Sequence, residues 1–208
     1  MSEVVPDLER PRGQGDRIAG LILAAGAGTR FGADPGAKLL AELDGRPLLE
    51  HAVAAQCGVA ALERVVVVLG AGAEEIQRRV AFGRAETVVC ADWARGQSFS
   101  VRCGVRALDG CDKLIVTLGD VPGIDPALIA RFVSEPPRTR AVYAGRPGHP
   151  VVLGPEELRA IEQLRGDAGA RELVAGGRRI ECGKPAANFD VDTPADLEAR
   201  RDEARAVL

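Results

Sequence analysis

Residues 18–38, IAGLILAAGAGTRFGADPGAK, decide the fold that the sequence predicts. The apolar run Ile18–Leu23 is short and is followed by glycines, which favours a fully buried strand over a helix. Residues 24–29, AAGAGT, have almost no side-chain bulk, so their backbone N–H groups can approach a ligand closely. Two cations follow, Arg30 and Lys38. We therefore interpret this stretch as a cradle for a triphosphate.

Two better-known glycine-rich motifs fail on spacing. The dinucleotide fingerprint G-x-G-x-x-G fits Gly26 and Gly28, but Phe31 occupies the third glycine position. A P-loop requires glycine before its lysine and Ser or Thr after it, whereas Lys38 stands between alanine and leucine. From the loop alone, a glycine-rich turn without any ligand remains an alternative.

The segment LAAGAGTRFG at residues 23–32, with Lys38 after it, resembles the signature of MobA-like nucleotidyltransferases. Its Leu-Ala-Ala-Gly start resembles the molybdenum cofactor cytidylyltransferases more than the guanylyltransferases. One departure is the stretch 34–37, which makes the spacing from Arg30 to Lys38 longer than is usual in that family. The resemblance implies that this loop binds the nucleotide, through Leu23, Ala24, Ala25, Gly26, Ala27, Gly28, Thr29, Arg30 and Lys38.

The 208 residues and their composition predict one globular domain, residues 17–208, behind a flexible N-terminal tail, residues 1–16. A net charge of −3 and few aromatic residues argue against a nucleic-acid binder. There is no apolar run long enough to span a membrane and no secretory signal. Five dispersed cysteines without a C-x-x-C pair argue against disulfides or zinc, so we expect a cytoplasmic protein.

Alternating buried strands and amphipathic helices predict a single-domain, three-layer α/β fold with a mostly parallel sheet. The resemblance implies a Rossmann-like nucleotidyltransferase fold with a small antiparallel extension. The strands are expected at 18–23, 64–69, 86–90, 112–118, 141–144, 151–153 and 178–182, with an extended piece at 38–43. The helices are expected at 47–57, 73–82, 97–107, 126–133, 155–163, 166–174 and 195–206.

A second nucleotide-contacting segment is expected at the start of the helix 97–107. Free N–H groups and hydroxyls at a helix start favour anions, although Ser98 can equally be a simple N-cap. The pattern G-x-S-x-S-x-x-x-G from Gly96 resembles the family's second nucleotide segment, which places Gln97 and Ser98 near base and ribose. The glycines that follow two strands, Gly70 and Gly119, complete the expected nucleotide-binding set.

Asp120 follows a buried strand, at the sheet edge where open α/β folds bind ligands. Mg²⁺ is typically held by one or two carboxylates together with substrate phosphates, although an aspartate here can also simply start a turn. The string G-D-x-P matches the family's metal-site signature, and D-x-D-T-P resembles its closing motif. We expect Asp120 and Asp190 to bind Mg²⁺, with Asp192 in the capping turn as the alternative.

Three further residues are assigned to the acceptor substrate by resemblance alone. His149 lies in G-H-P, and Asp167 and Arg171 lie in G-D-x-G-A-R. In isolation each has a structural reading, as a solvated histidine, a helix cap and a surface arginine. A role for His149 as general base is disfavoured.

The resemblance implies transfer of CMP from CTP to a phosphorylated acceptor such as a pterin cofactor, with Arg30, Lys38 and Asp120 catalytic. A molybdoenzyme or its chaperone would then receive the product. Three alternatives remain: a guanylyl or sugar-phosphate nucleotidyltransferase, an NAD(P)H-dependent reductase like the nicotine-blue-reductase relatives, and a catalytically silent nucleotide-binding regulator.

Overall fold

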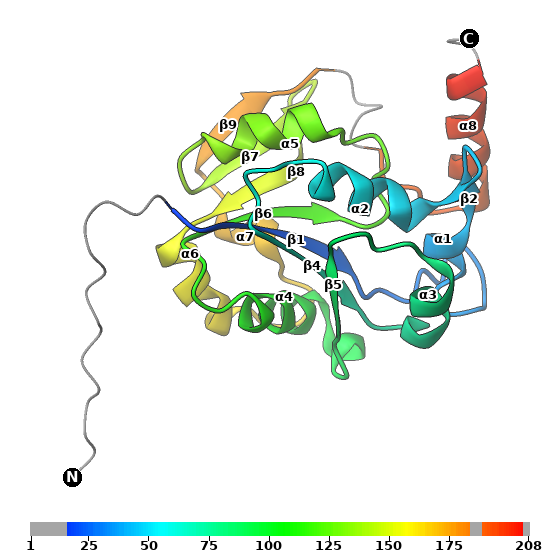
Figure 1. Ribbon diagram of the computed structural model, residues 1–208, viewed down its shortest axis with the longest axis horizontal. Coiled ribbons are helices and arrows are strands. Elements are labelled where there is room, and N and C mark those ends of the chain that lie inside the picture. Colours follow the sequence, from blue (N-terminus) through cyan, green and yellow to red (C-terminus); the bar gives the residue numbers. More distant parts are fainter. Residues whose placement is uncertain (1–15, 184–188, 206–208) are drawn as a thin grey trace.

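The computed structural model describes residues 16–183 and 189–205, so the expected tail lies outside the described residues except for Asp16. The described chain forms three layers, with a central sheet between two layers of helices (Figure 1). This confirms the predicted α/β class and the mostly parallel sheet. None of the described helices is long and apolar enough to cross a membrane.

The main sheet has seven strands in the order β5-β4-β1-β6-β8-β7-β9. Its first four strands are parallel, whereas β8 runs antiparallel to both β6 and β7, and β9 is parallel to β7. The strands are β1 (Ile18–Ala24), β4 (Arg64–Leu69), β5 (Glu86–Val89), β6 (Lys113–Leu118), β7 (Thr139–Tyr143), β8 (Arg146–Leu153) and β9 (Arg178–Glu181). A separate small hairpin pairs β2 (Glu42–Leu43) with β3 (Arg46–Pro47). The hairpin and the reversed β8 form the antiparallel part.

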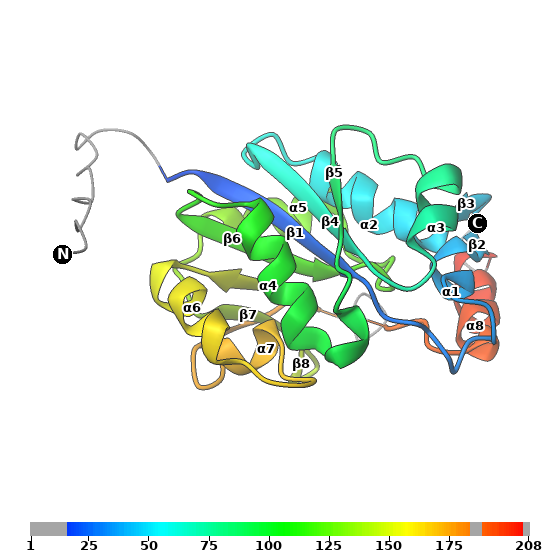
Figure 2. The same cartoon turned by 90° about the horizontal axis from the view of Figure 1, so that it is seen from below.

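Two apolar cores flank the sheet, since successive strand residues point to opposite faces. One core packs under α1 (Ala37–Leu40), α2 (Leu48–Cys57), α3 (Ala73–Arg79) and α5 (Pro126–Val133). The other packs under α4 (Gln97–Ala107), α6 (Pro155–Ala160), the 3₁₀ turn η2 (Ile161–Gln163) and α7 (Ala170–Leu173). Figure 2 shows α4, α6 and α7 together on one side. The last helix, α8 (Pro194–Arg205), packs through Leu197 in a third, small cluster with the β2–β3 hairpin.

Four local predictions were wrong. The helix expected at 166–174 is only α7, because Gly166 turns the chain at φ 55° and Gly169, not Asp167, is the N-cap. Residues 38–40 belong to the short helix α1 rather than an extended piece, because Gly36 reverses the chain at φ 85° and lets Leu39 and Leu40 enter the core. Pro47 precedes α2 as its N-cap instead of opening it. The predicted turn at 145–150 is mostly strand β8, and the actual turn is at residues 144–145.

The C-terminal segment crosses back to the sheet beside β6. The backbone N–H of Val191 donates to the carbonyl of Asp120 at 3.1 Å, and the Val191 side chain is fully buried. Thr193 then caps α8, since its hydroxyl accepts from the Asp196 N–H at 3.2 Å. This crossing places residues 190–192 next to Asp120.

Gly104 sets how closely α4 approaches the sheet. A Cβ there would lie 2.4 Å from Leu21 Cδ1 and 2.7 Å from Val68 Cγ2. We therefore expect Gly104→Ala to lower the free energy of unfolding by about 1–3 kcal/mol, although alanine favours a helix. A Cβ on Gly32 would meet no atom within 4 Å, so Gly32→Ala should change the free energy of unfolding by less than about 0.5 kcal/mol. Urea unfolding of both variants checks this, and equal stabilities would contradict the close packing.

Candidate functional site

The carboxyl ends of β1 and β6 open into a cleft of about 380 Å³. Its walls come from the glycine-rich loop, the 3₁₀ turn η1 (Trp93–Arg95), the start of α4, the end of β6 and the segment before α7. The lining residues are Leu23, Ala25, Gly26, Trp93, Ala94, Gly96, Gln97, Ser100, Leu118, Asp120 and Asp167. A smaller hollow of about 80 Å³ shares Leu23, Gly26 and Asp120 with the cleft and adds Ala24, Gly28, Lys38 and Leu39.

The glycine-rich loop is open toward this cleft. Gly26 is exposed, and a Cβ there would meet no atom within 4 Å. Gly28 has φ 64°, and its carbonyl accepts from the Phe31 N–H at 2.8 Å, so the loop turns tightly. Thr29 and Arg30 follow as exposed residues. Backbone amides in such a turn suit an anionic ligand, as the sequence predicted.

Lys38 lies at the centre of the charged groups. Its Nζ lies 2.5 Å from Asp120 Oδ2 and 2.9 Å from Asp192 Oδ1. Burial opposes the charged form, but the two carboxylates raise the pKa of Lys38 above its usual value. Arg30 reaches the same cluster from the solvent side, with Nη2 2.9 Å from Asp192 Oδ2. The Asp192 side chain is thus an ion-pair partner of both cations, while its backbone N–H belongs to the capping turn and donates to Asp196 Oδ2 at 3.0 Å.

Asp190 lies beside this cluster with its charge poorly compensated. Partial desolvation of the carboxyl and the negative charges of Asp120 and Asp192 raise the pKa of Asp190 to about 6. A cation would relieve this repulsion, and carboxylate oxygens suit a hard divalent ion. No three His, Cys, Asp or Glu side chains in the described ranges form a complete metal site on their own. A metal ion on Asp120 and Asp190 would need further ligands, such as substrate phosphates.

The start of α4 differs in detail from the prediction. Ser98 is fully buried and its N–H donates to the carbonyl of Gly166 at 3.0 Å, so Gln97 and Ser100 form the wall instead. Trp93 also lines the cleft, and Gly70 makes room for it, because a Cβ on Gly70 would lie 2.6 Å from Trp93 Cγ. Gly119 has a similar packing role, since a Cβ added there would lie 2.9 Å from the Cβ of Ala24.

The three expected acceptor residues lie in different environments. Asp167 lines the cleft and Arg171 is exposed on α7. The His149 side chain is only 3% exposed. Its burial, together with the charges of Arg171 and Arg140, lowers the pKa of His149 to about 3. His149 is therefore a neutral, enclosed imidazole, which agrees with the view that it is no general base.

Sequence reasoning missed two wall residues that left a usable signal. Ser100 lies three residues after Gln97, and this spacing places both on one face of a helix. Trp93 is the only tryptophan of the chain and directly precedes the predicted nucleotide segment. The two ion pairs of Asp192 had no such signal, because they depend on how the chain crosses beside β6.

The chain matches one protein family and resembles proteins whose names give two different activities. Residues 20–182 match the family model of the MobA-like NTP transferase domain. The nicotine blue oxidoreductase of Paenarthrobacter nicotinovorans is 33% identical over 191 residues, which cover 85% of this chain and 92% of that protein. A nucleotidyl transferase from Methanothermobacter has 25% identity and a TM-score of 0.78, over 93% of this chain and 100% of that one. Rv0371c of Mycobacterium tuberculosis in complex with manganese has 24% identity and a TM-score of 0.74, over 89% of this chain and 98% of that one.

The neutral state of His149 predicts a specific pH dependence of stability. Because its pKa is near 3 in the folded chain and about 6.5 when unfolded, stability is complete above pH 6.5 and falls as pH falls toward 3. Between about pH 6 and pH 4, His149 should make the unfolding free energy fall by about 1.4 kcal/mol for each pH unit. His149→Gln should remove this part of the fall. His51→Gln is the control, and urea unfolding across this range measures both. Parallel curves for wild type and His149→Gln would contradict the assignment.

Proposed function

The chain belongs to the MobA-like NTP transferase family and is a nucleotidyltransferase, and we propose that it transfers CMP from CTP to a phosphorylated acceptor such as molybdopterin, releasing pyrophosphate. The observation that carries this proposal is the Lys38–Asp120–Asp192 cluster, which borders the glycine-rich loop. A cradle of amides, a lysine and a pair of acids suits the polyphosphate end of a nucleotide. The adjacent cleft has room for the nucleoside.

In the proposed complex, the amides of residues 26–29 and the exposed side chain of Arg30 bind the β- and γ-phosphates. Lys38 already faces the shared hollow, so its ammonium can move partly from Asp120 to the α-phosphate. There it offsets the charge that develops as pyrophosphate leaves. The Arg30 side chain is 73% exposed, so it can turn toward the phosphates once its ion pair with Asp192 breaks.

Asp120 and Asp190 would hold a divalent cation, for which we propose Mg²⁺. When bound, this ion supplies charge neutralisation and alignment of the attacking and leaving oxygens. The repulsion that raises the pKa of Asp190 supports the assignment. The manganese in the Rv0371c structure belongs to that protein, and it is the reason to test Mn²⁺ alongside Mg²⁺.

The reaction needs no strong general base. A phosphate monoester has a second pKa near 6 and is mostly ionised at pH 7. One of its oxygens attacks the α-phosphorus, the bond from that phosphorus to the β-phosphate oxygen breaks, and pyrophosphate leaves. Catalysis then depends on positioning and on electrostatics. A neutral His149 is consistent with this, and we propose that His149, Asp167 and Arg171 contribute to the acceptor side.

The choice of nucleotide and of acceptor follows from the sequence of the glycine-rich loop. CTP is favoured over GTP by the Leu23-Ala24-Ala25-Gly26 sequence and its resemblance to cytidylyltransferases. A pterin acceptor, and a molybdoenzyme or its chaperone as recipient of the product, rest on the same resemblance.

A reductase is the second candidate, favoured by the name of the relative that is 33% identical. It would require a nicotinamide dinucleotide in the same cleft. Phe31 in place of the third fingerprint glycine argues against this. Oxidation of NADPH with candidate substrates distinguishes the two.

We expect CTP to stabilise the protein against heat only when Mg²⁺ or Mn²⁺ is present, because selective binding favours the folded state. GTP, ATP, UTP and NADPH are compared under the same conditions. A shift with NADPH and none with any triphosphate would overturn the proposal in favour of the reductase.

Asp120→Asn should reduce pyrophosphate release from CTP in the presence of acceptor by at least about a hundredfold, because it removes a carboxylate that is proposed to hold the metal ion at the reacting phosphates. Asp109→Asn, an exposed acid just beyond α4, should leave the rate unchanged. A nearly active Asp120→Asn enzyme would rule out Asp120 as a metal ligand.

Trp93→Ala should weaken CTP binding by roughly tenfold, whereas Trp93→Phe should retain most of the affinity, because a ring can still stack on the base. Calorimetric titration with CTP and Mg²⁺ measures both. Equal affinity of wild type and Trp93→Ala would show that the base does not contact the indole.

A further inference from the structure

Arg140 is the second residue of β7, with Val151 of β8 and Arg179 of β9 as its register partners. Residues that pair across strands share a face of the sheet. Val151 belongs to the core under α4 and α7, which also contains Val174 just beyond α7. The Arg140 side chain therefore lies on the face that α7 covers, together with Arg179.

The guanidinium of Arg140 lacks the partners that such a group needs. Its Nε and Nη2 atoms are buried, and neither has a hydrogen-bond partner among the described residues. Burial and the charges of Arg171 and Arg179 lower the pKa of Arg140. Glu172 is the acid that counteracts them, and its Oε2 already accepts from the Gly169 N–H at 2.7 Å. This corner of the fold therefore has an excess of positive charge.

Arg84 shows how the same chain satisfies an arginine with a structural role. Its Nε, Nη1 and Nη2 atoms donate to the carbonyls of Cys57, Leu62 and Val59, at 2.9–3.0 Å. No comparable set of bonds surrounds Arg140 in the described part of the chain. A buried cation without a partner lowers stability, so its presence indicates a partner that binds from outside.

We propose that Arg140, with Arg171 and Arg179, binds an anionic group of the acceptor substrate, a carboxylate or phosphate that is separate from the phosphate that reacts. The planar fork of arginine matches the two oxygens of either group. This inference rests on the proposed function, because it places the ligand on the acceptor side of the same site.

The location agrees with such a role. The charge of Arg171 acts on Arg140 and His149 and also on Asp190, one of the two expected metal ligands. Arg171 therefore connects the arginine corner with the reaction centre. An acceptor that carries a second anion would satisfy Arg140, whereas an acceptor with the reacting phosphate alone would leave it unsatisfied.

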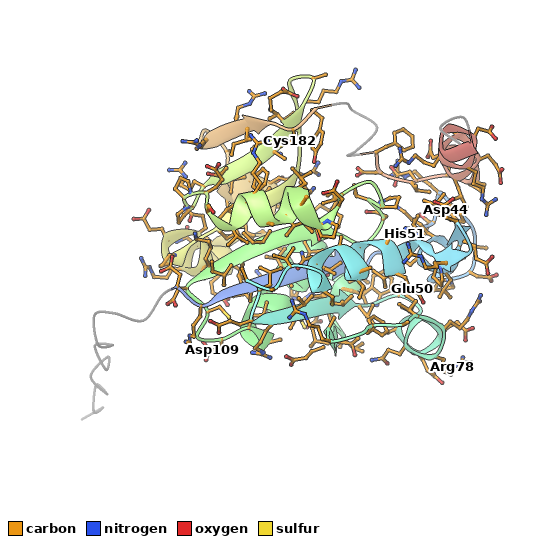
Figure 3. All side chains as sticks on the ribbon, turned by 45° about the horizontal axis from the view of Figure 1, so that its top comes forward. Asp44, Glu50, His51, Arg78, Asp109 and Cys182 are labelled. Carbon is orange, nitrogen blue, oxygen red and sulfur yellow. The ribbon has the colours of Figure 1, made fainter. Side chains whose placement is uncertain are left out.

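The two histidines of the chain allow a local test that does not depend on nucleotide binding. His149 senses the arginine corner, since Arg140 and Arg171 both act on it. His51 lies on α2, away from the β9 end of the sheet near Cys182 (Figure 3), and serves as the internal control. The protein is labelled with ¹⁵N-histidine and titrated with inorganic phosphate or acetate, against chloride at equal ionic strength. Comparison of the two anions tells which class of group the corner prefers.

We expect a saturable shift of the His149 side-chain signals and an unchanged His51 signal. Arg140→Met should weaken the phosphate response by roughly tenfold to a hundredfold, and Arg140→Lys should weaken it less. Arg159→Met, at an exposed arginine of α6, is the matched control and should respond like wild type. A response that is absent from the wild type, or equal in Arg140→Met and Arg159→Met, would overturn the inference.

Thermal unfolding separates this role from a structural one. Without added anion, Arg140→Met should melt roughly 2–4 °C higher than wild type, because it removes a partly buried charge whose Nε and Nη2 atoms have no hydrogen-bond partner among the described residues. A lower melting temperature would mean that Arg140 stabilises the fold itself. The phosphate titration is repeated with saturating CTP and Mg²⁺, which keeps phosphate out of the glycine-rich loop. If CTP fails to bind while His149 still responds to phosphate, the anion site stands and only the proposed function fails.

Discussion

The ammonium group of Lys38 lies between the carboxylates of Asp120 and Asp192 and joins segments that are far apart in the sequence. It fixes α1 against the end of β6 and against the chain that leads into α8. The backbone bond from Val191 to Asp120 strengthens the same junction. Asp190 lies beside the same junction, and the charges of Asp120 and Asp192 raise its pKa, which is why we propose that a divalent cation binds here.

The parallel sheet brings these groups together. β1 and β6 are neighbours, so the loop after β1 and Asp120 after β6 start from the same sheet edge. The Gly119 N–H donates to the carbonyl of Leu23 at 2.9 Å, which continues the pairing up to the site. β4 ends at the same edge with Gly70, whose missing side chain admits Trp93. A cleft at the carboxyl ends of strands thus follows from strand order, and the side chains in its walls determine its chemistry.

The strand–helix alternation and the glycine-rich loop could be predicted because they depend on local sequence patterns. The family model confirms the resemblance to MobA-like nucleotidyltransferases, but not the finer one to cytidylyltransferases. Sequence-based prediction was wrong where contacts between distant segments determine the local structure. The helix at Lys38 forms because Leu39 and Leu40 find a core, and Ser98 is covered because Gly166 packs on it. Arg140 had no signal, since an unsatisfied guanidinium is recognised only when its neighbours are known.

The most direct test of the account is a crystal structure with Mn²⁺ and a non-hydrolysable CTP analogue, in which anomalous scattering locates the metal. The proposed mechanism predicts a manganese peak at bonding distance from carboxylate oxygens of both Asp120 and Asp190. It also predicts the triphosphate on the amides of residues 26–29 and the base beside Trp93. A metal bound away from both aspartates, or a triphosphate outside the glycine-rich loop, would contradict it.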